Sequence, residues 1–295
     1  MRTIVYYVDE RYGGMTAAGF LGHCHGYSRR MITRLKQGCG SLAVNGTEAE
    51  RLTVQLKAGD RLEVRLEPQE QDFLPNAALC VPVVYEDEDV VVFSKPAGMP
   101  VHPSHRHRED TLANAFAARC CEKGERAGFH AVNRLDRDTS GLCVVAKHPL
   151  AADRLSRNLE KIYYAVAEGV IEPPEGKLSF PIARAGQSII LRRVDPAGKS
   201  AVTRYRTVEC GNGHSLLELR LETGRTHQIR VHFSHIGHPL AGDDLYGGGR
   251  GWISRQALHC GEVRFTQPIT GEKLAVYAPL PEEMERVLHP KSVSF

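Results

Sequence analysis

The loop sequence Asn133-Arg134-Leu135-Asp136-Arg137-Asp138-Thr139-Ser140-Gly141 runs directly into the apolar segment Leu142-Cys143-Val144-Val145-Ala146. The Thr-Ser-Gly sequence predicts a turn, and the apolar segment predicts a buried strand that holds this turn at its edge. Asp136 lies between two arginines, and arginine can clamp a carboxylate or a phosphate with two parallel hydrogen bonds. An isolated Asp-Arg pair is more often a solvated surface turn, so the rest of the chain has to decide between these interpretations.

Other blocks of the chain support a functional interpretation. They resemble the RluA-type family of pseudouridine synthases, which isomerise uridine to pseudouridine within RNA, and the resemblance covers roughly residues 80 to 288. Several ordered blocks are far more specific than one short motif. The family usually has His where this chain has Asn133. The matching blocks are Ser94–Pro103, Asn133–Gly141, Leu221–Phe233, Gly237–Asp243 and Arg255–His259.

Charge is nearly balanced overall but unevenly distributed. The chain has 295 residues, 42% of them hydrophobic, and a formal net charge of +3. This length can bury a full core and predicts two domains. Three basic segments, Arg11–Thr47, Arg184–Arg206 and the stretch between Glu222 and Asp243, contain one acidic residue in total, Asp195. Clustered positive charge on a balanced chain is the electrostatic footprint of an RNA-binding protein.

Cysteine and histidine spacing does not indicate a metal site. The eight cysteines include no Cys-x-x-Cys pair and follow no secretory signal peptide, so we expect reduced thiols in a cytoplasmic protein. His23-Cys24-His25 lacks a second ligand pair, and we expect His232, His235 and His238 to lie on a helix surface or to face RNA. No apolar run is long enough to span a bilayer. We expect a monomer without a membrane anchor.

Residues 1–75 predict a small N-terminal α/β module. Ser28 caps an expected helix over Arg29–Gln37, and Asn45-Gly46 predicts a hairpin turn. The pattern resembles the alpha-L RNA-binding module, although glycines upstream of Tyr27 weaken its expected first helix. The polar stretch Glu67–Asp72 is the expected linker. The resemblance implies RNA contacts by four cations, Arg29, Arg30, Arg34 and Lys36, with Arg30 and Arg34 on one exposed helix face.

Residues 76–295 are expected to form the catalytic domain. Runs of strands with few helices predict an α+β fold around a mixed, mostly antiparallel sheet. Helical periodicity is found at Leu150–Glu160 and Thr226–Ile236, the latter with Arg230 away from its buried face. Strands are expected at Val83–Tyr85, Val90–Phe93, Leu142–Lys147, Ile162–Ala167, Val202–Val208, Leu216–Leu221 and Glu262–Phe265.

The resemblance also implies which residues do the chemistry. Conversion of uridine to pseudouridine adds no atom and no electron, so neither metal nor redox cofactor is expected. Asp136 is the implied carboxylate, acting as nucleophile or base, and Arg230 is the implied partner that favours its ionised form. Tyr163 is the implied active-site tyrosine, with Tyr164 as the alternative if the register is shifted by one. Arg134 is implied to fill the space left by an extruded base.

Two other functions compete with this interpretation. Asp136-Arg137-Asp138 mimics the two-aspartate motif of magnesium-dependent phosphohydrolases, but there the apolar strand precedes the motif. A non-catalytic RNA-binding or ribosome-assembly factor could keep the fold, although Asp136, Tyr163 and Arg230 are all present. Ribosomal RNA is the favoured substrate because of the N-terminal module, and transfer RNA is the alternative.

Overall fold

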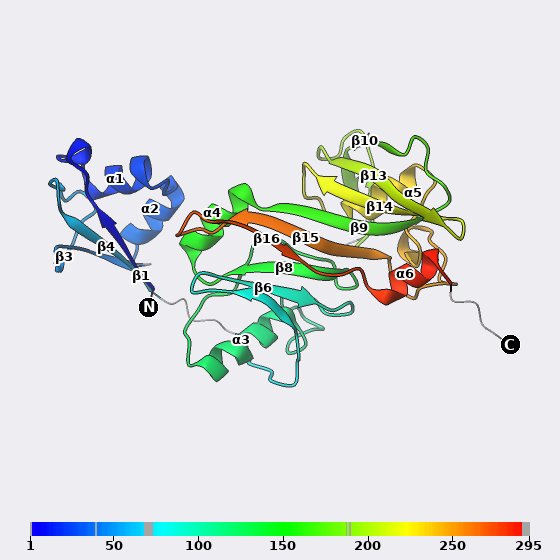
Figure 1. Ribbon diagram of the computed structural model, residues 1–295, viewed down its shortest axis with the longest axis horizontal. Coiled ribbons are helices and arrows are strands. Elements are labelled where there is room, and N and C mark those ends of the chain that lie inside the picture. The colour runs from blue at the N-terminus through cyan, green and yellow to red at the C-terminus, as the bar shows by residue number, and fades with distance from the viewer. Residues whose placement is uncertain (1, 39, 68–72, 187, 189, 291–295) are drawn as a thin grey trace.

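A computed structural model describes residues 2–38, 40–67, 73–186, 188 and 190–290. These residues form a large sheet flanked by helices and a smaller sheet at one end of the molecule (Figure 1). The α+β prediction is confirmed, since nearly all strand pairs are antiparallel. None of the helices within this part of the chain is both long and apolar enough to cross a membrane.

The N-terminal part contains a four-stranded antiparallel sheet covered by two helices. Ser28 caps the second helix as predicted, accepting a hydrogen bond from the Met31 amide at 3.1 Å. Asn45 and Gly46 both adopt positive φ and join β2 to β3, as the hairpin prediction required. The elements are β1 (Arg2–Tyr7), α1 (Ala17–Cys24), α2 (Arg29–Lys36), β2 (Gly40–Val44), β3 (Thr47–Ala49) and β4 (Arg61–Leu66).

The glycine-rich segment upstream of Tyr27 is more regular than its composition suggests. It forms α1, with Thr16 as a capping residue, so the expected first helix is present despite its glycines. Packing overrides propensity here: Phe20 and Leu21 are buried, and a Cβ at Gly22 would lie 3.3 Å from Ile32 Cδ1 of α2. Glycine therefore lets the two helices approach closely.

The large sheet has the strand order β10-β13-β14-β9-β15-β8-β6-β5, with β16 paired to β15 and β7 paired to β8. All seven strands expected here are present, and β7, β10 and β16 were not predicted. A separate hairpin pairs β11 (Ile182–Arg184) with β12 (Arg192–Val194). The strands are β5 (Val83–Glu86), β6 (Val90–Lys95), β7 (His130–Ala131), β8 (Ser140–Ala146), β9 (Glu160–Glu168), β10 (Glu175–Ser179), β13 (Val202–Gly211), β14 (His214–Leu221), β15 (Leu258–Thr266) and β16 (Lys273–Tyr277).

Strand β15 lies between β8 and β9 although it comes last of the three in the chain. Its pairing with β8 is parallel, whereas its pairing with β9 is antiparallel. Gly141 makes the parallel pair possible, because it has φ +108° and a Cβ there would lie 2.3 Å from Cys260 O. The turn before β8 is thus held against the centre of the sheet.

Helices cover both faces of the sheet. Alternate residues of β14 face opposite ways: Leu217 and Leu219 share a core with α5, whereas Leu216 packs with Met284 of α6. Beneath β6, the ring of Phe116 in α3 contacts Phe93 edge-on. The helices are α3 (Leu112–Lys123), α4 (Pro149–Asn158), α5 (Gln228–His235) and α6 (Glu282–Leu288), with a short 3-10 helix η2 (Asp244–Tyr246).

The N-terminal part contacts the domain of the large sheet. It packs against α4, and its strand β1 lies near the β5–β6 turn. Leu150 of α4 is buried in the core of the N-terminal part. Arg154 of α4 donates to His25 O at 2.7 Å and its guanidinium lies over the Tyr27 ring. Arg2 reaches the buried Asp89, whose carboxylate also accepts from His148 and Gln267. The expected linker falls mostly on residues 68–72, outside the described residues, so the boundary at residue 75 stays a prediction.

Two predictions around α5 need correction. The helix spans Gln228–His235 rather than Thr226–Ile236, because His227 adopts a left-handed conformation. His232 is not on the helix surface: it is fully buried and contacts Thr203 Oγ1 and Phe180 O, both at 3.0 Å. The three-residue spacing did not indicate a common face, since His235 is exposed. The seven cysteines in the described part of the chain are free thiols.

Candidate active site

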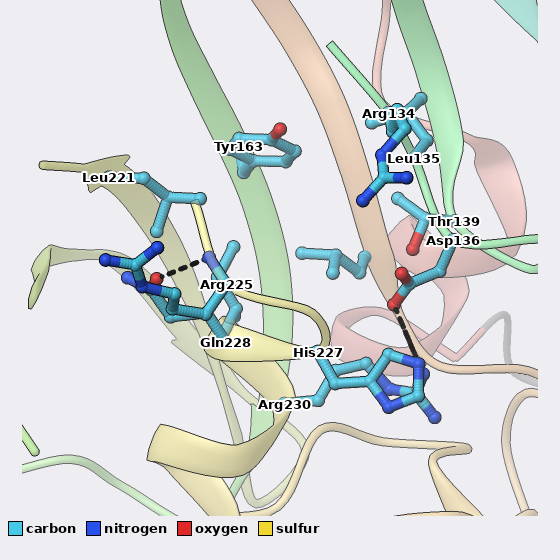
Figure 2. Close-up of a pocket in the computed structure, with 12 residues that line it drawn as sticks. Arg134, Leu135, Asp136, Thr139, Tyr163, Leu221, Arg225, His227, Gln228 and Arg230 are labelled. Atoms are coloured by element: carbon cyan, nitrogen blue, oxygen red, sulfur yellow. Dashed lines mark hydrogen bonds and ion pairs between the residues drawn. The ribbon is translucent and has the colours of Figure 1, made fainter. Parts of the chain in front are cut away.

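A pocket of about 60 Å³ opens where the turn before β8, the middle of β9 and the start of α5 converge (Figure 2). It brings together four of the predicted residues from distant parts of the sequence: Arg134, Asp136, Tyr163 and Arg230. The remaining lining residues are Leu135, Thr139, Leu221, Arg225, His227, Gln228, Ile229 and Leu258.

The turn that carries Asp136 is fixed by two cations that bind successive carbonyl groups. Lys95 at the end of β6 is 1% exposed, and its ammonium donates to Arg137 O at 2.9 Å and to two carbonyls of its own loop. Arg255 donates to Asp138 O at 3.1 Å and to Ser140 Oγ at 3.2 Å. Burial lowers the pKa of Lys95 to about 8.

Asn133 is a structural residue that ties the loop to the strand it precedes. Its side-chain amide donates to Leu142 O at 2.9 Å and accepts from the Val144 amide at 2.7 Å. The side chain thus copies the donor and acceptor of a neighbouring strand. The Asn133 amide satisfies both groups at once, at the position where the resembling family usually has His.

Arg230 links Asp136 to a second, fully buried carboxylate. Its Nε and Nη2 donate to the two oxygens of Asp243, both at 2.7 Å, and its Nη1 donates to Asp136 Oδ2 at 3.2 Å. The side chain of Arg230 is 7% exposed and its guanidinium lies 5.0 Å from the centre of the Tyr246 ring. Arg230 lies on a different side of α5 from Ile229 and Phe233, as expected, but this side is buried too, because Asp243 pairs with the guanidinium there.

Tyr163 lies in β9 with its side chain in the pocket, while Tyr164 points to the opposite face and packs near α6. The register that assigns Tyr163 to the pocket therefore holds. Burial, followed by the nearby Cys260 and Asp136, raises the pKa of Tyr163 well above its ordinary value. The phenol remains protonated at neutral pH.

The predicted RNA-contacting cations occupy two separate regions. Arg134 is exposed at the pocket rim and makes no hydrogen bond or ion pair with the residues that the structure describes (Figure 2). Arg29, Arg30 and Lys36 are exposed on α2, near the opposite end of the large sheet (Figure 1). Arg34 is only partly exposed. Burial, together with the nearby charge of Arg34, lowers the pKa of His130 to about 4. Arg30 and Arg34 thus do not share a fully exposed face.

Three residues that complete the site were not predicted from the sequence: His227, Asp243 and Tyr246. His227 Nε2 lies 3.8 Å from Asp136 Oδ2, and its Nδ1 is 2.8 Å from the Tyr246 hydroxyl. His227 and Asp243 occur within the blocks that resemble the family, so their position was a signal for a role. Tyr246 falls outside every such block, and only the fold brings it to the site.

A second pocket of about 450 Å³ continues from the first past Arg225. Its lining includes Arg184 and Arg192 of the β11–β12 hairpin together with Lys199 and Arg225. Positive charge beside the Asp136 pocket suits a polyanion whose backbone must be held while one residue enters the pocket. Within the described residues there is no cluster of three or more side chains that could hold a metal ion.

Comparisons with known proteins agree with this geometry. The profile of the family described as "RNA pseudouridylate synthase" matches residues 89–235. The chain is 42% identical to the uncharacterized RNA pseudouridine synthase YjbO of Bacillus subtilis over 93% of this chain and 98% of that protein. It is 39% identical to the ribosomal large subunit pseudouridine synthase D of Vibrio parahaemolyticus, over 85% of this chain and 84% of that protein.

A solved structure extends the likeness to three dimensions. The structure titled "Human RNA Pseudouridylate Synthase Domain Containing 1" is 28% identical, with a TM-score of 0.57 over 70% of this chain and 85% of that chain. The chain belongs to the RluA-type family of RNA pseudouridine synthases. It is therefore an RNA-modifying isomerase, which excludes the phosphohydrolase alternative.

Proposed function

We propose that this pseudouridine synthase isomerises uridines in ribosomal RNA and that Asp136 is its catalytic carboxylate. The observation that carries the proposal is the position of Asp136: its side chain is 28% exposed, faces the pocket, and accepts one hydrogen bond from Arg230. Arg230 is itself anchored by Asp243 through its other two nitrogens, Nε and Nη2. The carboxylate is thereby oriented, while part of it stays open to a substrate.

The hydrogen bond from Arg230 Nη1 at 3.2 Å holds the Asp136 carboxylate in one orientation toward the pocket. An ionised carboxylate can attack C1′ of the ribose as a nucleophile or remove a proton as a base, and both routes start from this geometry. The uracil is then detached, rotated and joined again through C5. Asp243 matters because it holds Nε and Nη2 of Arg230, which fixes the guanidinium with Nη1 directed at Asp136.

Tyr163 and Arg134 have different roles in this proposal. The protonated phenol of Tyr163, at the inner end of the pocket, packs its ring against the uracil and offers an O–H donor. Arg134 at the rim has no protein partner within the described residues, so its guanidinium is free to occupy the gap that an extruded uridine leaves. Extrusion costs a few kcal/mol, and a cation within the strand offsets part of that cost.

Ribosomal RNA is the favoured substrate for two reasons. The relative from Vibrio parahaemolyticus is named for the large ribosomal subunit. In addition, the exposed cations of α2 and those of the hairpin pocket are widely separated, which suits an extended, folded RNA. Transfer RNA is the alternative substrate.

The test compares purified wild-type protein with Asp136→Asn, using Asp138→Asn in the same turn as the control. The substrate is ribosomal RNA extracted from a strain that lacks the protein, and pseudouridine is mapped chemically. We expect Asp136→Asn to lower the single-turnover rate at least about 1,000-fold without weakening RNA binding. Asp138→Asn should keep most activity, because the Asp138 side chain pairs with Arg137.

Either of two results would contradict this proposal. Substantial turnover by Asp136→Asn would remove Asp136 from the catalytic role. Pseudouridines missing from transfer RNA of the deletion strain, with ribosomal RNA unchanged, would replace the proposed substrate by the alternative.

A further inference from the structure

His227 has an unusual backbone for a residue beside a reactive carboxylate. Three non-glycine residues in the described part of the chain have positive φ, and two of them, Asn45 and Asn212, precede a glycine in hairpin turns where Asn is well tolerated. His227 is the third, with φ +57° at the start of α5. A left-handed conformation is unfavourable for a non-glycine residue. Strain of this kind points to a constraint on where the side chain is held.

The hydrogen bonds around His227 define which nitrogen carries its proton. The Tyr246 hydroxyl accepts a hydrogen bond from the Arg192 amide at 3.0 Å. Among the described residues, the only acceptor within reach of its own proton is His227 Nδ1 at 2.8 Å. This arrangement favours the tautomer in which Tyr246 donates to Nδ1 and the neutral imidazole carries its proton on Nε2.

The environment keeps the imidazole neutral and its Nε2–H available. Burial lowers the pKa of His227, and the charges of Arg230 and Arg192 act in the same direction, against the carboxylate of Asp136. The side chain is 12% exposed and lines the pocket. Nε2 is 3.8 Å from Asp136 Oδ2, too long for a hydrogen bond, so this donor has no acceptor within the described residues.

We propose that His227 is a further catalytic residue, whose Nε2–H donates a hydrogen bond to a carbonyl oxygen of the uracil while the base is detached from the ribose. This inference rests on the proposed function of the Asp136 pocket. A neutral donor suits an uncharged carbonyl that becomes negative only during the reaction, because such a donor stabilises the developing charge more than the bound substrate.

The reaction remains balanced with His227 in this role. Breaking the C1′–N1 bond leaves its electron pair on the uracil, where the charge spreads from N1 to the two carbonyl oxygens. When C5 bonds to C1′, the proton on C5 is lost and N1 gains one, so the product is an isomer of the substrate. The imidazole only donates a hydrogen bond, and no proton leaves it.

The experiment measures single-turnover rate and RNA affinity for His227 variants on ribosomal RNA from a strain that lacks the protein. His227→Ala should slow the reaction about 100-fold, the loss typical of one such donor, with affinity changed less than about twofold. His227→Asn tolerates the left-handed backbone but is too short to place its amide, so it should be equally slow without a folding defect. His227→Gln, with a longer amide, should recover part of the rate.

Two further variants separate this role from a structural one. His235→Ala, on the exposed side of the same helix, is the matched control and should be unaffected. Tyr246→Phe removes the group that fixes the imidazole proton while keeping the ring over Arg230. Tyr246→Phe should lower the single-turnover rate when His227 is present. In the His227→Ala background it should cause no further loss, because both changes affect the same donor.

If His227→Ala and His227→Asn convert uridine within about threefold of the wild-type rate, or lose affinity and rate equally, the inference is overturned while the proposed function stands. If the wild-type protein itself forms no pseudouridine in ribosomal RNA, the proposed function is overturned and the inference with it.

Discussion

Lys95 shows how a single buried charge can control the geometry of a catalytic turn. Its ammonium has three N–H donors, and three carbonyls accept them: Pro96 O, Met99 O and Arg137 O. The neutral amine has only two N–H donors, so deprotonation leaves one of these buried acceptors without a partner. The residue before Arg137 is Asp136, which makes the turn sensitive to that loss.

Because the pKa of Lys95 is lowered to about 8, we predict that catalysis by the wild-type enzyme declines above that pH. The stability of the protein should respond in the opposite sense. Between about pH 8 and the ordinary lysine value of 10.5, the unfolded chain binds more protons than the folded one, so this group makes the free energy of unfolding rise with pH.

The measurement combines single-turnover rates with denaturant unfolding from pH 7 to pH 10. Lys95→Met removes the titrating group, so its rate should be lower throughout but should lack the decline attributed to Lys95. Three carbonyls without a donor should also lower its free energy of unfolding by about 3 kcal/mol at pH 7. An identical alkaline decline in wild type and Lys95→Met would assign that decline to another group.

Residue-level predictions succeeded where a side chain sits in a distinctive block. Asp136, Tyr163 and Arg230 were placed in one pocket from sequence, although their catalytic roles remain proposals. The burial of Arg230 and the position of His227 beside the pocket were not predictable from the sequence. Both depend on Asp243 and Tyr246, which fold back beside α5. Helical periodicity describes a single helix and does not indicate which residues of the next loop will contact it.

At the level of secondary-structure elements, the parallel contact between β8 and β15 is the feature most sensitive to substitution. Gly141 pairs with Lys95 on one side and Cys260 on the other, and an added Cβ would lie 2.3 Å from Cys260 O. We predict that Gly141→Ala lowers the free energy of unfolding by about 3 kcal/mol or more, since neither backbone can move without breaking a central strand pair. Chemical denaturation of the two proteins gives the value.

Gly213→Ala is a matched control for backbone strain alone. Gly213 also has positive φ, +71°, but a Cβ added there would meet no atom within 4 Å beyond its chain neighbours. Its substitution should cost only about 1–2 kcal/mol, the penalty of the left-handed conformation. Equal losses for the two variants would show that the strand contact at Gly141 is not limiting.

At the scale of elements, the sequence pattern predicted the buried strands well and the amphipathic or glycine-rich segments poorly. The β8 and β9 segments are apolar enough to be recognised without tertiary information. α1 contains Gly19 and Gly22, and glycine has a low helix propensity. The contacts between α1 and α2 nevertheless stabilise α1 as a helix. Short strands such as β11 and β12 depend on each other and carry little signal alone.

For the whole molecule, the arrangement of positive charge gives a test of the N-terminal RNA-binding prediction. Arg29, Arg30 and Lys36 are exposed on α2, and Figure 1 shows α2 far from α5, the helix that carries Arg230. We predict that changing all three to Gln in the full-length chain weakens RNA binding and makes its salt dependence shallower by about 1–3 units of slope. The rate at saturating RNA should stay unchanged, because none of the three lies near Asp136.

Binding curves at several salt concentrations check this prediction, with Arg286→Gln on the exposed side of α6 as a control for charge alone. An unchanged slope in the triple variant would mean that α2 does not contact RNA. Full-length variants are preferable to truncation, since removal of the N-terminal part would expose Leu150 and leave Asp89 without Arg2. That docking could not be foreseen from sequence, where the two parts look separate.

The place of β15 in the sheet has a consequence for synthesis on the ribosome. The chain emerges from its N-terminus, so β8 and β9 are made well before the strand that separates them. Until Leu258–Thr266 has emerged, Asp136 and Tyr163 have no common scaffold, and Arg255, which binds the Asp136 turn, is also missing. A nascent chain therefore acquires its capacity to modify RNA only after β15 has left the ribosome.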